Sequence, residues 1–199
     1  QYIREQGAVS KQDIVIGLGL SLPTITQNLN NLAELGLIDT SKKISNTGGR
    51  NATAYSYIEK ARYAVGLYLN RHHINCVAVD LSGNVISLIR VRENFDLNDD
   101  NYLRKIGETV EEVKKDTGLS DDRFLGVGIA VQGLISDDGE RVTYGLTLNF
   151  TGVTRADIAK YIPYHNRLFH DSAAAGYAEV WDRNDLDDAF YLSLSNSVG

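Results

Sequence analysis

The pattern of apolar and polar positions predicts two helices separated by a tight turn near the start of the chain. Ser10 can cap a helix over residues 11–18, and Asp13 stands where it can complete a capping box. Gly19 supplies the left-handed conformation that a short helix–helix turn requires. A second helix follows Ser21, and its apolar residues recur at spacings of four, three and three. These residues are Ile25, Leu29, Leu32 and Leu35.

The opposite face of the second helix is polar and almost uncharged. It carries Thr24, Thr26, Gln27, Asn28, Asn30 and Asn31. Such side chains both donate and accept hydrogen bonds, and Asn or Gln can bond adenine in bidentate fashion in the major groove. We interpret this face as one that reads DNA. A helix that only meets solvent is the alternative, although it would more often carry Lys and Glu.

Two short apolar runs, residues 37–40 and 54–58, predict strands joined by a basic connection. Arg50 follows two glycines at the tip of this hairpin and suits a narrow minor groove or a phosphate track. A flexible surface loop is the alternative. A helix–turn–helix with a basic hairpin is a winged helix. The predicted DNA-binding residues are Ser21, Pro23, Thr24, Thr26, Gln27, Asn30, Lys42, Lys43, Gly49 and Arg50.

The rest of the chain alternates between strand and helix patterns. Three β-rich runs predict a meander, and a long amphipathic helix and a nearly continuous apolar strand follow it. These elements span residues 63–69, 74–80, 85–91, 98–117 and 124–131. Further predicted elements are a hairpin turn at 137–140, helices over 154–161 and 173–181, and strands over 168–170 and 189–194. The order β-β-β-α-β-α-β-α predicts an α/β fold: the first lobe of an actin-like, ribonuclease H-like architecture of the sugar-kinase type.

Composition and charge divide the chain into two parts. It has 199 residues, 43% of them hydrophobic, and a net charge of −6. Residues 1–60 hold six Lys/Arg against five Asp/Glu, whereas the remainder holds 14 against 21. We therefore predict two domains, residues 1–60 and 61–199, of which only the first can approach a polyanion.

Several features bear on location and completeness. No apolar run reaches the roughly 18–20 residues that span a bilayer, and the first residues of this sequence do not show the layout of a signal peptide. The single cysteine, Cys76, fits a reducing compartment and is most simply a core thiol. These features predict a cytoplasmic protein without a membrane partner. Because the chain lacks methionine and stops in an apolar segment, we expect it to be a piece of a longer protein.

Several motifs, taken in order, resemble those of one known family. They comprise residues 10–38 and 48–50 in the first part, and 63–66, 79–86, 126–133, Asn149, 171–175 and Glu179 in the second. The chain resembles the ROK family (repressors, open reading frames and kinases), in its DNA-binding repressor branch. The resemblance implies a repressor of carbohydrate genes that binds a double-stranded operator and responds to a sugar or sugar derivative. A homodimer or higher homo-oligomer is expected, because paired recognition helices must reach half-sites about 34 Å apart.

The chain departs from the family's kinases at both phosphate loops. The first loop has the pattern Asp-x-Gly-Gly-Thr, whereas residues 68–72 here read Tyr-Leu-Asn-Arg-His. The second has the pattern Gly-Thr-Gly-Val-Gly, whereas residues 195–199 read Ser-Asn-Ser-Val-Gly. We therefore expect no ATP binding, no enzymatic activity and no cofactor. A sugar kinase with an added DNA-binding head is the alternative.

The resemblance also implies effector contacts at Gly133, Asn149 and Asp171. In the kinases the residue at the position of Asp171 deprotonates the sugar hydroxyl, and without ATP it can still accept a hydrogen bond from that hydroxyl. Asp171 as a helix N-cap and Asn149 as a turn residue are the alternatives. His170 and Ala173 stand where the family carries asparagine, which leaves the ligand open. A body that only oligomerises remains a third possibility.

The histidines give no indication of a metal site. His72, His73, His165 and His170 are scattered along the sequence, and only one cysteine is present. Zinc sites in proteins usually combine four closely spaced His and Cys ligands. We predict no metal in this chain.

Overall fold

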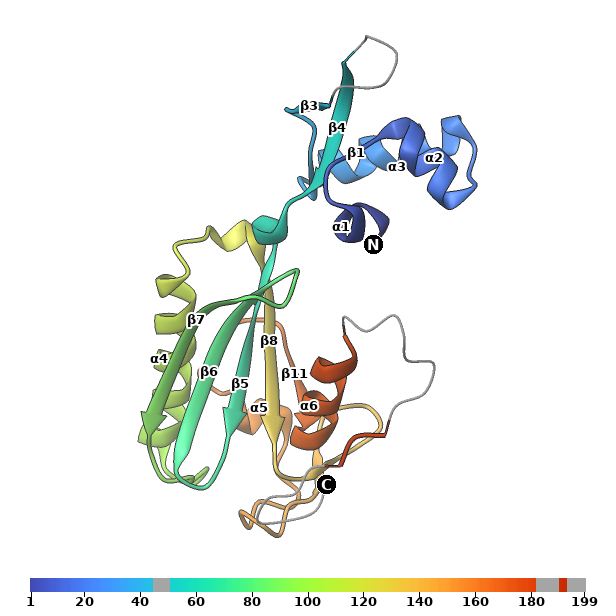
Figure 1. Ribbon diagram of the computed structural model, residues 1–199. Helices are drawn as coiled ribbons and strands as arrows, with labels where there is room; N and C mark the ends of the chain where they lie inside the picture. Colours follow the sequence, from blue (N-terminus) through green and yellow to red (C-terminus); the bar gives the residue numbers. More distant parts are fainter. Residues whose placement is uncertain (45–50, 182–189, 193–199) are drawn as a thin grey trace. The chain divides into compact units, whose positions relative to one another are not determined.

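The chain folds as two compact units. The computed structural model describes residues 1–44, 51–181 and 190–192 (Figure 1). Unit 1 comprises Gln1–Arg62 with Asp80–Ser82, and unit 2 comprises Tyr63–Val79 with the residues from Gly83 onward.

Unit 1 begins with three helices, α1 (Tyr2–Gln6), α2 (Lys11–Leu18) and α3 (Leu22–Glu34). The predicted capping box of α2 is confirmed: Ser10 Oγ accepts from Asp13 N at 3.2 Å, and the Asp13 carboxylate accepts from Ser10 N at 2.9 Å. Gly19 ends α2 with φ 63°, in the predicted left-handed conformation. Ser21 caps α3 by accepting from Thr24 N at 3.3 Å, as predicted.

Four short strands complete unit 1. They are β1 (Val9–Ser10), β2 (Ile38–Asp39), β3 (Lys43–Ile44) and β4 (Ala52–Tyr57). β4 pairs antiparallel with each of the other three. The strands expected over 37–40 and 54–58 correspond to β2 and β4. The sequence did not predict β1 and β3, because a two-residue strand is too short to show an alternating pattern.

Unit 2 is built on a mixed five-stranded sheet. Its strands are β5 (Tyr63–Leu69), β6 (His73–Asp80), β7 (Val85–Arg92), β8 (Phe124–Val131) and β11 (Asn166–His170). The order is β11-β8-β5-β6-β7. β8 runs parallel to both β5 and β11, whereas β6 and β7 are antiparallel. The predicted bounds of β5 and β8 match these strands residue for residue.

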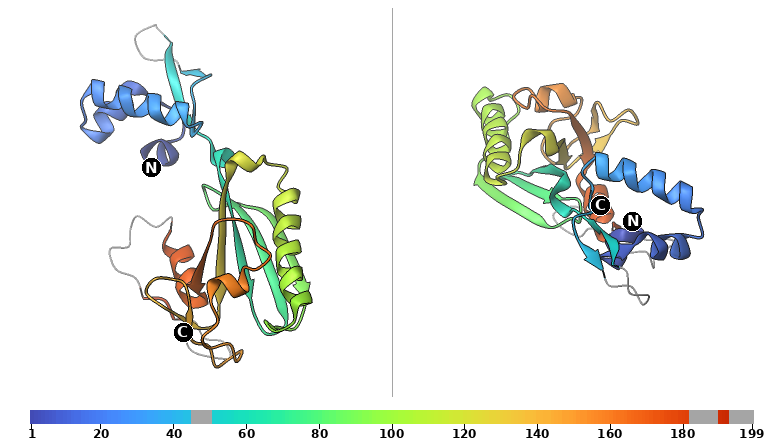
Figure 2. Two further views of the ribbon diagram at one scale, coloured as in Figure 1. Left: turned by 180° about the vertical axis from the view of Figure 1, so that it is seen from behind. Right: turned by 90° about the horizontal axis from the view of Figure 1, so that it is seen from above.

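Helices cover both faces of this sheet. α4 (Asp100–Asp116) lies on one face, and α6 (Asp171–Val180) lies on the other, over β8 and β11 (Figures 1 and 2). Alternate residues of β5, including Leu67, are buried in one cluster with the apolar side of α4. Gly107 allows α4 to approach the segment after α5 (Arg155–Ile158) closely, because a Cβ at this position would lie 2.5 Å from the Tyr161 carbonyl oxygen. Smaller elements are the hairpin β9 (Leu134–Ile135) and β10 (Val142–Tyr144), and the 3-10 turns Glu59–Ala61 and Asp121–Arg123.

Some predicted elements differ from the structure. The helix expected over 154–161 is shorter, since α5 ends at Ile158. α6 begins at Asp171 rather than at residue 173, so His170 is its N-cap and Asp171 is its first helical residue. The alternative that Asp171 is the N-cap is therefore wrong. Of the strand expected over 189–194, Phe190–Leu192 belong to no strand, and the other residues lie outside the described ones. Apolar character alone suggested that strand, and it does not supply a pairing partner.

The part of the chain that the structure describes contains no helix long and apolar enough to cross a membrane.

Candidate functional site

The outer face of α3 presents a row of side chains to solvent. Pro23, Gln27 and Asn30 are exposed and lie four and three residues apart, on the side of the helix opposite the buried Ile25 and Leu29. This spacing places the three on one stripe along the helix axis. The predicted reading face is thus a continuous exposed stripe in which Gln27 and Asn30 are central.

Hydrogen bonds within the helix distinguish the residues at the edge of this stripe. Thr26 is half-buried and donates its hydroxyl to the Leu22 carbonyl oxygen at 2.8 Å. Gln27 Nε2 donates to Asn31 Oδ1 at 2.9 Å, and the hydroxyls of Ser21 and Thr24 lie 2.8 Å apart. The Thr26 hydroxyl is therefore occupied by the helix backbone. The Gln27 amide bonds an exposed side chain and can bond another group in its place.

Charge favours the N-terminal half of α3 as the part that meets an anion. The first turn contains no acidic residue, and Glu34 is the last residue of the helix. The unpaired backbone N–H groups and the helix dipole make the N-terminal end of a helix electrically positive.

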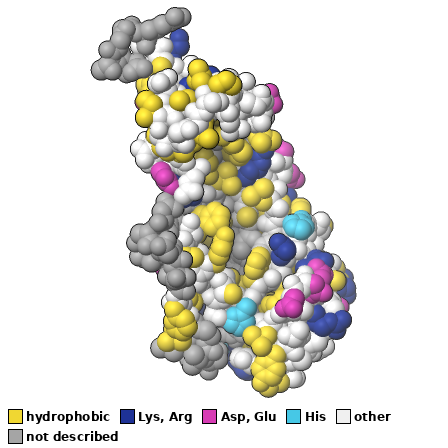
Figure 3. Space-filling view, turned by 90° about the vertical axis from the view of Figure 1, so that its right-hand side faces the viewer, with side chains coloured by type: hydrophobic (Ala, Val, Ile, Leu, Met, Phe, Trp, Pro, Cys, Tyr) yellow, Lys and Arg dark blue, Asp and Glu magenta, His cyan; other side chains and the backbone are white. Residues whose placement is uncertain are grey.

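The basic residues predicted for the hairpin are only partly described. Lys42 and Lys43 are exposed, Lys43 pairs with Thr53 in the β3–β4 ladder, and the Lys42 carbonyl accepts from Ala54 N at 2.9 Å. Gly49 and Arg50 lie outside the described residues. On the face shown in Figure 3, the coloured Lys and Arg side chains lie among acidic and hydrophobic ones and form no continuous coat. Contact with a polyanion would therefore depend on local groups.

In unit 2 the three parallel strands end level with one another. Val131 pairs with Leu69 of β5 on one side and with His170 of β11 on the other. In α/β sheets, ligands bind outside the carboxyl ends of the strands. The residues at and after these three strand ends are therefore the candidate ligand site of unit 2.

This edge brings together Tyr68, Gln132 and Asp171. Gln132 Nε2 donates to Tyr68 Oη at 3.3 Å. Burial raises the pKa of Tyr68, and the negative charge of Asp171 raises it further. The phenol therefore stays protonated at neutral pH, accepts a hydrogen bond from Gln132 and has its own proton to donate.

Asp171 is oriented by its neighbours at the start of α6. Its Oδ1 accepts from Ser172 N at 2.8 Å and lies 3.6 Å from His170 Nδ1. Ser172 Oγ and His170 Nδ1 are 2.7 Å apart. In the described part of the chain Asp171 Oδ2 has no hydrogen-bond partner, so the half-buried carboxylate retains one oxygen for a ligand.

Gly133 and Asn149 lie in the segment between β8 and α5, which contains the β9–β10 hairpin and follows the same strand end. A Cβ on Gly133 would lie 2.9 Å from Val142 Cγ1 and 3.0 Å from the Tyr144 carbonyl oxygen, so only glycine allows this packing. Asn149 is exposed in a turn with φ 56°, a left-handed conformation that asparagine tolerates better than most residues. Gly133 therefore acts here through packing, and the predicted effector contacts of both residues stay predictions.

One arginine ties this loop to the end of β5. Arg71 Nη2 donates to the Thr147 carbonyl oxygen at 2.7 Å. The segment after β5 corresponds to a phosphate loop in the kinases, and here its Arg71 hydrogen-bonds the backbone beside the Asn149 turn. The structure connects the Asn149 turn to the site through Gly133 and Arg71, and it gives no direct contact between Asn149 and Asp171.

Tyr68 and Gln132 are not among the predicted site residues, although Tyr68 stands where the phosphate-loop pattern of the kinases has aspartate. Each stands at the carboxyl end of a strand in the parallel set. This position at a strand end is the signal that could have identified them, but using it requires knowing which strands are neighbours in the sheet.

The described residues hold no group of three or more His, Cys, Asp or Glu side chains suited to a metal ion. Cys76 is buried in the core of unit 2, and burial raises its pKa to about 12. A thiol of this kind is unreactive, because the thiolate is the nucleophilic form.

Comparison with known proteins gives structural matches only. No protein-family model and no curated protein matches the sequence. Among solved structures, the chain matches a ROK family transcriptional regulator, described as a homolog of the E. coli MLC protein. The TM-score is 0.64 and the identity 18%, over 90% of this chain and 46% of that chain.

Two ROK family kinases match with lower similarity. One is a glucokinase from Streptomyces griseus in complex with glucose and AMPPNP, with TM-score 0.47 and 15% identity over 59% of this chain and 36% of that chain. The other is a hexokinase from Thermus thermophilus, with TM-score 0.47 and 20% identity over 59% and 38% of the two chains.

These matches identify the fold. The mixed α/β sheet and the match to the regulator show that the chain has the fold of that ROK protein. The matched regulator is a member of the ROK family, which confirms the expected resemblance at the level of fold. The chain spans about half the length of the matched regulator.

Proposed function

We propose that the chain acts in transcriptional regulation, as a DNA-binding repressor that responds to a sugar-like effector. Unit 1 is then a winged helix-turn-helix that binds a double-stranded operator, and unit 2 is the sensor. The observation that carries the proposal is the exposed, uncharged stripe of Pro23, Gln27 and Asn30, with two amide side chains, on the second helix of a helix–turn–helix.

In this proposal α3 enters the major groove with its N-terminal half foremost. Gln27 and Asn30 meet base edges, since amide side chains match the donor and acceptor pattern of adenine. Lys42 and Lys43 contact the backbone from the hairpin, together with Gly49 and Arg50 at its tip. Two copies of the chain place two such helices on half-sites about 34 Å apart, so the regulator works as a homodimer or a higher oligomer.

The effector site of unit 2 binds hydroxyl groups and does not transfer phosphate. Asp171 Oδ2 accepts a hydrogen bond from an effector hydroxyl, and Tyr68 donates one to an effector oxygen. A kinase needs a carboxylate and flexible glycines at the end of its first strand, whereas this chain has the bulky Tyr68 fixed by Gln132. The protein is therefore proposed to be a sensor and not an enzyme.

The DNA-binding part of the proposal is tested by selection. The full-length protein is incubated with a random pool of double-stranded oligonucleotides, and the bound fraction is sequenced over several rounds. We expect enrichment of a two-fold symmetric sequence with half-sites about one helical turn apart. A pool that shows no enrichment, while the protein remains folded, would contradict the proposal.

The sensor part is tested by a sugar screen with the selected operator. Thermal-shift measurements on the full-length protein across hexoses, pentoses and their derivatives should identify one stabilising sugar, which then changes operator affinity. Asp171→Asn should weaken that stabilisation and leave DNA affinity without sugar unchanged. If no sugar raises the thermal midpoint of the protein, unit 2 serves only oligomerisation.

The alternative function is a sugar kinase with an added DNA-binding head. Asp171 stands where such a kinase carries its base, and this observation keeps the alternative open. A coupled ADP-release assay on the same sugars distinguishes the two. ADP release that disappears in Asp171→Asn would establish the kinase.

A further inference from the structure

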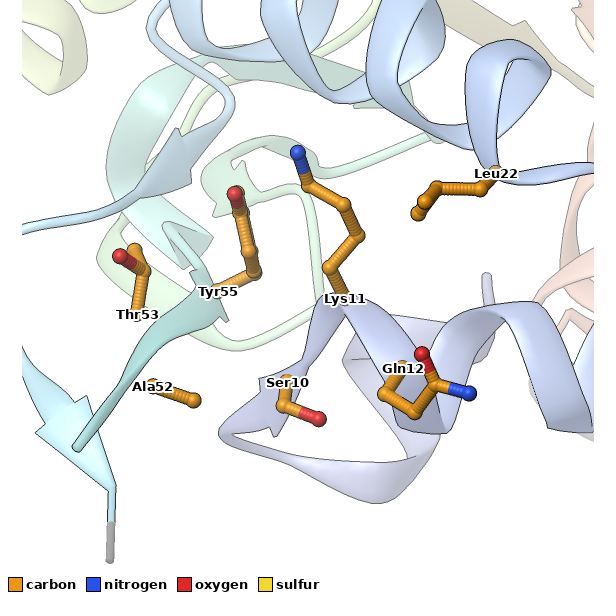
Figure 4. Close-up of a pocket in the computed structure, with 7 residues that line it drawn as sticks. All are labelled: Ser10, Lys11, Gln12, Leu22, Ala52, Thr53 and Tyr55. Carbon is orange, nitrogen blue, oxygen red and sulfur yellow. The ribbon is translucent and has the colours of Figure 1, made fainter. Parts of the chain in front are cut away.

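Unit 1 contains a polar pocket that is separate from the outer face of α3. Its volume is ≈ 320 Å³. Three elements line it (Figure 4): the start of α2 with Ser10, Lys11 and Gln12, the start of α3 with Leu22, and β4 with Thr53 and Tyr55. The pocket thus lies between the recognition helix and the strand that leads out of the basic hairpin.

Three of the polar side chains that line this pocket have no partner among the described residues. In Figure 4 the amine of Lys11 and the hydroxyls of Tyr55 and Thr53 point toward the same side. Within the described residues, none of these three side chains makes a hydrogen bond or an ion pair. A cation and two hydroxyls that extend to one side of a pocket, without partners among the described residues, can donate to an external acceptor.

The charges around the pocket favour an anion. No acidic side chain is among those that line it. The carboxylate of the nearby Asp13 is engaged by Ser10, whose backbone N and Oγ lie 2.9 Å and 2.7 Å from Asp13 Oδ2. Among the described residues Lys11 therefore forms no ion pair, and the apolar side chain of Leu22 lies beside it.

We propose that this pocket binds one backbone phosphodiester of DNA. Lys11 supplies the charge, and Tyr55 and Thr53 donate hydrogen bonds to the phosphate oxygens. This inference rests on the proposed function, in which α3 and the hairpin contact DNA. The pocket adds a contact to the DNA backbone between these two elements. A phosphate contact carries no sequence information, but it fixes the register in which Gln27 and Asn30 meet the bases.

The test uses the salt dependence of DNA binding. Fluorescence anisotropy titrations of the full-length protein on the selected operator and on a scrambled duplex are run from about 0.05 to about 0.3 M salt. Loss of one phosphate contact reduces the slope of log affinity against log salt by about 0.9, and lowers affinity about fivefold at 0.15 M. We expect Lys11→Gln to show both effects, equally on the two duplexes.

Three further variants separate charge from structure. Lys11→Arg should preserve the slope. Tyr55→Phe should lower affinity a few-fold without changing the slope, because the hydroxyl is neutral and the ring still packs on the core of unit 1. Lys115→Gln, which removes an exposed charge from α4, is the matched control and should leave both duplexes unaffected.

Each contrary result has a distinct meaning. If the wild type binds its operator and Lys11→Gln changes neither slope nor affinity, the phosphate pocket is wrong and the proposed function stands. If Lys11→Gln affects the operator alone, Lys11 reads a base, which also overturns the inference. Competition by inorganic phosphate at constant ionic strength, seen for the wild type but not for Lys11→Gln, would by contrast support the pocket as the phosphate site. If the wild type binds no duplex, both proposals fail.

Discussion

The two units of the chain are stabilised and equipped in different ways. Among the described residues, the core of unit 1 consists of six buried hydrophobic side chains, whereas that of unit 2 contains 21. A small core leaves unit 1 dependent on local devices such as caps and turns. Its candidate functional residues are also local, within α3, whereas Tyr68, Gln132 and Asp171 of unit 2 meet only through strand pairing. The comparison predicts that core substitutions act mainly on unit 2 and local substitutions mainly on unit 1.

The largest effect is expected from Ile129→Ala in the middle of β8. Ile129 is fully buried and pairs with Leu67 and Leu168 on its two sides. Loss of a buried aliphatic side chain of this size costs about 2–5 kcal/mol of unfolding free energy. Urea unfolding followed by labelling of Cys76 measures unit 2 directly, because that thiol reacts only once its core opens.

The same Ile129→Ala variant tests whether the units respond separately. We expect affinity for the selected operator to remain at the wild-type level in conditions where unit 2 is still folded. A parallel loss of DNA binding and of Cys76 protection would show that the two units unfold together, and the comparison between them would be wrong.

The next effect is expected on DNA recognition. Gln27→Ala should cost about 1–3 kcal/mol at one base pair of the operator and relax the preference at that position. Substituting each base pair of the selected operator in anisotropy titrations locates the affected position. Asn28→Ala is the matched control. The sequence pattern placed Asn28 on the reading face, but in the structure it borders the apolar groove lined by Ile25 and Leu29 and lies off the exposed stripe. Equal effects of the two variants would contradict the assignment of the stripe.

A smaller effect is expected from Ser10→Ala at the start of α2. This change removes the hydroxyl half of the capping box with Asp13 and should cost about 1 kcal/mol. Because the core of unit 1 is small, this cost should lower the thermal midpoint of unit 1. Circular dichroism separates the two transitions, and the control Thr154→Ala removes the equivalent capping box of α5 in unit 2. Destabilisation confined to unit 2 by Ser10→Ala would refute the comparison.

The smallest effect is a pH dependence at Asp100. Hydrogen bonds from Lys160 at 2.7 Å and Tyr161 at 2.8 Å lower the pKa of this carboxyl from 3.8 to about 2. A lowered pKa in the folded state means that the stabilisation is present above about pH 4 and is lost as pH falls toward 2. The contribution is small, because the groups are exposed to solvent.

The measurement compares thermal midpoints of the wild type and Asp100→Asn between pH 2 and pH 6. We expect a difference at pH 6 that narrows as the pH falls and vanishes near pH 2. A difference that is constant with pH would show that the carboxylate charge contributes nothing.

The sequence predicted local features more reliably than distant ones. The caps at Ser10 and Ser21 and the left-handed Gly19 follow from short motifs whose chemistry lies within four residues. The bounds of β5 and β8 follow from long apolar runs. β1 and β3 were missed, because pairing with β4 creates these strands and their own two residues do not.

The site of unit 2 shows the same limit. Asp171 was named from a family resemblance, but its neighbours Tyr68 and Gln132 lie 103 and 39 positions earlier in the sequence. Their proximity depends on the parallel register of β5, β8 and β11, which no local pattern encodes. On α3 the helical period alone sufficed to place Gln27 and Asn30 on one face.

The alternation of side chains along β5 decides which of its residues face the candidate site of unit 2. Successive residues of a strand point to opposite faces, and on β5 Leu67 and Leu69 are buried toward α4 while Tyr68 lies between them. Deletion of the single residue Ala64 or Gly66 would leave a sequence that still favours a strand. Every residue on one side of the deletion would then point to the opposite face of the sheet. Such a deletion would place a leucine where Tyr68 faces the candidate site, without any substitution at the site itself, whereas a two-residue deletion would preserve the alternation.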